Sequence, residues 1–224
     1  MTEKRQMSQS IYLAILLALA GGMLDAYTFL CRGGMFATAQ TGNLVTLGIC
    51  AAQGDFHRVF YYILSVIAFS TGIFTAELLT LLDTRLRLHW RQWGLLIECA
   101  ILLAVAFTPN DYDLAVCLLV SYISAIQLET FRKFRGKNCA TTMCTGNLRS
   151  ASELIYNRMF KKGKPGAYVY YLTIGSFVLG AVCSGFLAPR MGNRTVLMPC
   201  IPLVLGFLLM FSEHEFRLNI RKSL

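Results

Sequence analysis

Two short stretches of this sequence carry the same tetrapeptide, Thr-Gly-Asn-Leu, and spacing of this kind predicts a solute-binding site. The stretches are 40–54 and 144–158, and each has about a dozen helical residues, whereas crossing a bilayer takes roughly 20. The free N–H groups and the positive dipole end of a helix start bind anions or strongly polar groups. The residues predicted to bind the solute are Gln40, Thr41, Gly42, Asn43, Thr145, Gly146 and Asn147.

A purely structural role is the alternative for single residues of this motif. Thr or Asn caps helix starts, and Gly lets membrane helices approach closely. The duplication of the whole set favours a shared site.

Three acids in apolar segments are predicted to couple transport to a proton or a cation, because ionisable groups inside a membrane are costly. They are Asp25, Glu98 and Glu129. The alternatives are a salt bridge from Asp25 to Arg32, interfacial exposure of Glu98, and an interfacial position of Glu129 beside Arg132.

Other chemistry has little support in the sequence. The eight cysteines form no CxxC pair and the three histidines lie far apart, so we expect no metal site and no catalytic nucleophile. A phosphate-binding G-x-x-x-x-G-K-S/T loop is also missing from the sequence. We therefore expect no enzyme and no cofactor, and expect any pumping to use an ion gradient.

The elements that must position these residues are membrane helices. The 224 residues are 55% hydrophobic and 15% charged, which argues against an ordinary soluble domain. Net charge +9 does not indicate nucleic acid here, because the bases lie in clusters between apolar runs. The expected partners are the lipid bilayer and a small solute. The six runs long enough to span are 11–30, 57–82, 92–108, 112–130, 168–189 and 195–212.

The distribution of positive charge predicts how the short stretches run. With six spans and an inside N-terminus, 17 of the 21 Lys and Arg residues lie in the cytoplasm; with eight spans the loops divide ten against ten and Arg149 falls inside a helix. Positive charge favours the cytoplasm. The two stretches are therefore predicted to dip in and return, with both chain termini cytoplasmic in a bacterial inner membrane.

An internal repeat supports this plan. A shift of 104 residues aligns the two motifs and pairs Thr38 with Thr142 and Asp25 with Glu129. A shift of 108 lays the small residues at 68, 72 and 76 over those at 176, 180 and 184. Such rows pack either the two halves together or two copies as a homodimer, and the sequence leaves both open.

Each half then contains an odd number of crossings, which inverts one half relative to the other. The predicted fold is an all-α membrane protein with six transmembrane helices and two re-entrant half-helices in an inverted 3+3 repeat. It forms one membrane domain, 1–224, with repeat one at about 8–108 and repeat two at about 112–212.

The segments GGMLDAYTFL and MFATAQTGNLVTLG, with the later TGN copy, resemble the YoaK-type family of bacterial membrane proteins, a group named as a domain of unknown function. The resemblance covers about residues 8 to 211. It implies a multi-span inner-membrane protein, and brings no established substrate or catalytic residue. The second copy diverges, with Glu129 for the acid and Cys144 in place of Gln40, so the two sides of a symmetric site would differ.

These patterns together predict a secondary transporter, or permease, for a small polar or anionic solute bound at the midplane between the two TGN half-helices. A passive channel built from the same half-helices is the alternative, as is a membrane scaffold or sensor that transports nothing.

Overall fold

The computed structural model describes residues 10–82, 90–134, 137–161, 163 and 165–210. Regular structure in these ranges is helical apart from a hairpin of two short strands, β1 (Lys133–Phe134) and β2 (Lys137–Asn138). The helices are α1 (Ile11–Cys31), α2 (Gln40–Ala52), α3 (Phe56–Leu82), α4 (Trp90–Val105), α5 (Asp113–Thr130), α6 (Cys144–Phe160), α7 (Tyr168–Met191), the 3-10 turns η2 (Asn110–Tyr112) and η3 (Gly192–Leu197), and a final helix Cys200–Met210.

Among the described residues, four helical segments are long and apolar enough to cross a membrane. They are Ile11–Cys31, Phe56–Thr80, Asn110–Thr130 and Tyr168–Leu197. The other two predicted spans contain shorter apolar helices, Gly94–Val105 and Cys200–Met210. Large apolar side chains stay exposed along α3 and α7 in particular, among them Ile67, Phe74, Leu179 and Phe186, which suits contact with lipid. The all-helical membrane architecture predicted from the sequence is therefore confirmed at this coarser level.

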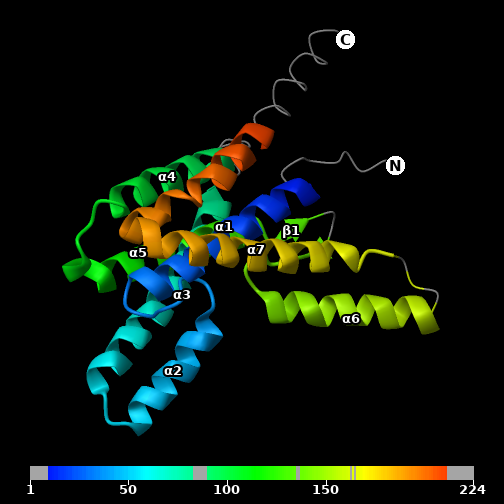
Figure 1. The fold of residues 1–224 in the computed structure, drawn as a ribbon. Helices are drawn as coiled ribbons and strands as arrows, with labels where there is room; N and C mark the ends of the chain where they lie inside the picture. The colour runs from blue at the N-terminus through cyan, green and yellow to red at the C-terminus, as the bar shows by residue number, and fades with distance from the viewer. Residues whose placement is uncertain (1–9, 83–89, 135–136, 162, 164, 211–224) are drawn as a thin grey trace.

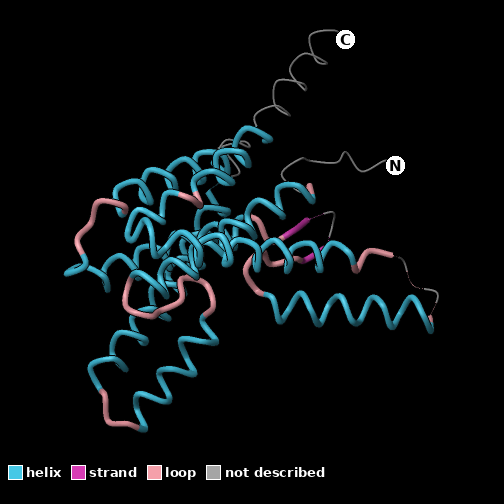
Figure 2. Tube along the Cα trace, viewed as in Figure 1, coloured by secondary structure: helices cyan, strands magenta, loops and turns pink. Residues whose placement is uncertain are grey.

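The most extensive helix contacts join the two halves of the chain. α1 packs along α7, and α3 packs along α5; the blue α1 and the orange-yellow α7 cross near the centre of Figure 1. α2 packs chiefly on α3, and α6 chiefly on α7. Each of these two short helices therefore extends away from the other helices alongside the helix that follows it. Figure 2 shows the loops that lead into α2 and α6 near the middle of the molecule.

Glycine makes both of the large helix crossings close. A Cβ on Gly180 of α7 would collide with the backbone of Leu19 in α1, and a Cβ on Gly72 of α3 would collide with the carbonyl of Tyr122 in α5. Ser184, one turn after Gly180, donates to the carbonyl of Met23 at 2.9 Å. The small-residue rows therefore pack the two halves together, which is one of the two roles that the sequence left open.

Arg32 follows α1 directly, and its side chain contacts the C-terminal end of α4 and the N-terminal end of α5. Its side chain is fully buried and forms an ion pair with Asp113 at 2.9 Å. Its other N–H groups are also used, because buried charge must be hydrogen-bonded. They donate to the hydroxyl of Tyr27 and to the carbonyls of Val105, Thr108 and Pro109.

Part of the predicted charge distribution lies outside the described residues. The bases concerned are Lys4, Arg5, Arg85, Arg87, Arg135, Lys162, Lys164, Arg217, Arg221 and Lys222.

We predict that Gly180→Leu lowers the free energy of unfolding by about 3 kcal/mol or more, because the new side chain has no room against α1. Gly185→Leu on the same helix is the matched control, since a Cβ there meets open space. Unfolding of the purified protein in mixed detergent measures both. Equal stability of the two variants would contradict the α1–α7 crossing.

Candidate functional site

Asp25 holds the loop that leads into α2. Its buried carboxylate accepts hydrogen bonds from the backbone N–H of Thr38 at 2.6 Å and from the Thr38 hydroxyl at 2.7 Å. The backbone N–H groups of Ala37 and Ala39 also interact with it. A carboxylate of the protein therefore already occupies the amide-rich approach to α2, where the sequence predicted a small polar or anionic solute. The salt bridge from Asp25 to Arg32, the alternative weighed for this acid, is wrong, because Arg32 pairs with Asp113.

The loop that leads into α6 docks on the same helix one turn earlier. A Cβ placed on Gly21 would lie 3.7 Å from the Cβ of Thr142 and would overlap its methyl group. Cys144, the first residue of α6, interacts electrostatically with Asp25. Positions four apart share one face of a helix. Thr38 and Thr142, which the 104-residue shift pairs, therefore meet one face of α1 at adjacent turns.

The two motif asparagines close these loops. The amide of Asn43 accepts from the N–H of Phe36 at 2.9 Å and donates to its carbonyl at 2.8 Å. Asn147 donates to the carbonyl of Ala140 at 2.6 Å. Both partners lie seven residues before the asparagine, and both asparagines are buried. The helix-capping alternative is wrong for them, because the N-caps are Ala39 and Met143 without side-chain cap bonds.

The remaining motif residues do not form a shared buried site in the described structure. Thr41 and Thr145 are exposed, and Gln40 bonds within its own turn, donating to the carbonyl of Ala37 and accepting from Asn43. Gly42 lies under the ring of Phe36, whereas a Cβ at Gly146 would meet open space.

A cavity of about 480 Å³ lies beside the start of α6. The first half has a phenylalanine, Phe36, where the second has Ala140 under the 104-residue shift, and the smaller residue leaves the space above Gly146 unfilled. The lining residues are Arg132, Cys139, Ala140, Met143, Gly146, Asn147 and Ser150.

Glu129 does not repeat the role of Asp25. It forms an ion pair with Arg132 at 2.7 Å, and Arg132 also lies 3.4 Å from Glu77. This geometry supports the interfacial alternative for Glu129. The buried hydroxyls of Thr141 and Thr142 accordingly find no hydrogen-bond partner among the described residues.

Glu98 is buried in the centre of α4, so its interfacial alternative is wrong. One carboxylate oxygen accepts from the amide of Gln127 at 3.0 Å, and the other has no hydrogen-bond partner in the described part of the chain. A cavity of about 320 Å³ between α3, α4 and α5 is lined by Glu98, Gln127 and Thr130 with mostly apolar neighbours. The sequence indicated Glu98 but gave no sign of Gln127, which contacts it through tertiary packing, or of Thr130, which lines the same cavity.

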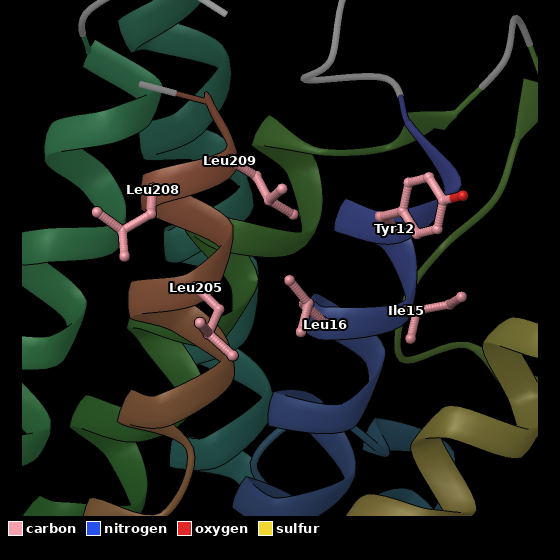
Figure 3. Close-up of a pocket in the computed structure, with 6 residues that line it drawn as sticks. All are labelled: Tyr12, Ile15, Leu16, Leu205, Leu208 and Leu209. Carbon is pink, nitrogen blue, oxygen red and sulfur yellow. The ribbon is translucent and has the colours of Figure 1, made fainter. Parts of the chain in front are cut away.

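Figure 3 shows a further cavity, of about 460 Å³, between the first half of α1 and the Cys200–Met210 helix. Its lining is apolar except for the Tyr12 hydroxyl, which suits contact with hydrocarbon. Of the residues that the structure describes, no group of three His, Cys, Asp or Glu side chains is placed to hold a metal.

Comparison with known proteins places the chain in a family. The profile of a family described as "Protein of unknown function (DUF1275)" matches residues 13–209. The UPF0700 transmembrane protein YoaK of Bacillus subtilis (strain 168) is 25% identical over 207 residues, covering 87% of this chain and 90% of that protein. No solved structure matches. The similarity and the long apolar helices fit a multi-pass membrane location, in contact with the lipid bilayer.

We predict that Thr38→Val and Asp25→Asn each lower the free energy of unfolding by about 2 kcal/mol, because each leaves a buried charged hydrogen bond unmade. A double-mutant cycle should give a coupling energy of about 1–2 kcal/mol.

Thr142→Val is the matched control in the second half. Its hydroxyl has no partner among the described residues, so the loss should be close to zero or the protein slightly more stable. Equal losses at Thr38 and Thr142 would contradict the anchoring role of Asp25.

Proposed function

This chain belongs to the DUF1275 family of proteins of unknown function, and we propose that it works as a secondary transporter of a small polar solute. The observation that carries the proposal is the docking of both TGN loops on one face of α1, at Gly21 and Asp25. Irregular backbone inside a membrane protein is tolerated only where protein or a watery cavity satisfies it. Transporters use such interrupted helices to build their solute sites.

The proposed architecture is an inverted repeat of six crossings with α2 and α6 as re-entrant helices. Three pairs of matching contacts support it. α1 packs on α7 as α5 packs on α3; Gly180 and Gly72 allow the same close crossing; and Asn43 and Asn147 close loops of the same length. Inverted halves of this kind place a solute site where the repeats meet.

The geometry favours a neutral or cationic solute over an anionic one. A free anion at the start of α2 would meet the carboxylate of Asp25, which already receives the N–H groups there. The buried acids Asp25 and Glu98 supply negative charge inside the bundle, and such groups are the usual carriers of a coupling proton or cation. Nothing in this proposal requires an enzyme activity, a cofactor, nucleic acid or a second copy of the chain.

The proposed topology predicts the location of two loops. Reporter domains fused after Asn110, in the turn before α5, should be periplasmic, and those fused after Lys161, at the end of α6, should be cytoplasmic. Alkaline phosphatase and fluorescent-protein fusions in a bacterial inner membrane measure this directly. The reverse pattern at both positions would contradict the inverted orientation.

Transport itself is tested with the purified full chain in liposomes. A panel of labelled amines, amino acids and sugars should include a solute whose gradient-dependent uptake saturates and shows counterflow. Glu98→Gln should lower that uptake at least tenfold because it removes the buried charge, while Glu153→Gln on the exposed face of α6 should leave it unchanged.

Absence of uptake for every solute, with a known transporter active in the same vesicles, would contradict the proposal. Flux without saturation or counterflow would indicate a channel instead.

A further inference from the structure

Two of the residues that line the cavity beside Glu98 carry a buried side-chain oxygen without a hydrogen-bond partner among the described residues. These oxygens are one carboxylate oxygen of Glu98 and the hydroxyl of Thr130. Glu98 is only 3% exposed, and its other oxygen is held by Gln127. A buried charge left half-paired is costly in a protein of marginal stability. Such a group is expected to have a partner beyond the described residues, and a ligand in the adjoining cavity can supply it.

The walls of this cavity exclude a bare metal ion as that partner. Apart from Glu98, Gln127, Thr130 and Arg91, the lining is Gly94 and apolar side chains. Hard metal cations need six or more oxygen ligands or retained waters, which these walls do not supply. The volume of about 320 Å³ is instead within the range of small organic ligands, roughly 300–1,000 Å³.

The negative charge of Glu98 sets the sign of the ligand. An anion would be repelled by Glu98, and a neutral apolar molecule would leave its free oxygen unpaired. Arg91, which has interactions of its own, lies seven residues before Glu98 on α4 and so about 10 Å away along the helix. For a group hydrogen-bonded to Glu98, the carboxylate is the charge in direct contact, although Arg91 lines the same cavity.

We propose that this cavity binds a monovalent organic cation, with its ammonium group on Glu98 and its apolar body against the side chains of α4 and α5. The inference rests on the proposed transport function and names the solute class for it. An amine-bearing lipid headgroup offers the same chemistry as a soluble amine, so the experiment separates the two.

The test uses the full chain in lipid-free, nonionic detergent with benzylammonium, whose N–H groups can donate to Glu98, as the probe and benzenesulfonate as an anion of similar size. Calorimetry should show saturable binding of the cation and none of the anion. Glu98→Gln should weaken the cation at least tenfold. Glu153→Gln, which removes one exposed charge elsewhere, should change the affinity less than twofold.

Gly94→Leu is a second variant that leaves Glu98 intact. Gly94 lines the cavity, a Cβ there meets open space, and position 94 lies one turn before Glu98 on the same face. The new side chain should fill the cavity and abolish binding while the helix is stabilised. A folded Gly94→Leu protein with unchanged affinity would overturn the proposal, as would equal binding of cation and anion or unchanged binding by Glu98→Gln.

Added phosphatidylethanolamine distinguishes the two sources of the amine. If the lipid displaces the probe, the cavity binds cations and its natural ligand is a lipid headgroup. If the probe stays bound, the cavity binds cations and its natural ligand is a soluble amine. Probe binding that depends on Glu98, in a protein that transports nothing in liposomes, would support this site and reject the transport function, so the two claims fail separately.

Discussion

The constraint on which this structure depends is that polar backbone inside a membrane protein must be satisfied by the protein itself. The loop before α2 meets it with Asp25, whose carboxylate receives the N–H and the hydroxyl of Thr38. Asn43 then closes the same loop on itself. With these bonds in place, α2 can begin within the molecule and extend outward along α3 (Figure 1). The position of the first TGN motif, at the start of α2, thus depends on the buried carboxylate of Asp25.

The same arrangement is incomplete in the second half of the chain. Glu129 pairs with Arg132 at the surface, so the hydroxyl of Thr142 has no partner among the described residues. Ala140 stands in place of Phe36 and leaves a cavity beside α6. The two loops therefore differ in charge and in free volume, and only the loop before α2 is held by the aligned acid, Asp25.

Much of this could be predicted from sequence because it depends on pattern. Apolar length located the helical segments, and the spacing of the TGN motif located the starts of α2 and α6. The partners of buried groups could not be predicted, because they come from distant parts of the chain. Arg32 meets Asp113, 81 positions later, and Gln127 meets Glu98, 29 positions earlier. Residue type shows that a buried charge needs a partner, but only packing decides which one.

The central claim is that both polar loops dock on adjacent turns of α1, and a cross-link tests it most directly. The Cβ atoms at positions 21 and 142 lie 3.7 Å apart, within the range that a disulfide requires. In a background without the native cysteines, Gly21→Cys with Thr142→Cys should form a disulfide under mild oxidation, detected by mass spectrometry of the linked peptides. Gly175→Cys with Thr142→Cys should stay reduced. A folded Gly21→Cys, Thr142→Cys protein that never cross-links would contradict the account.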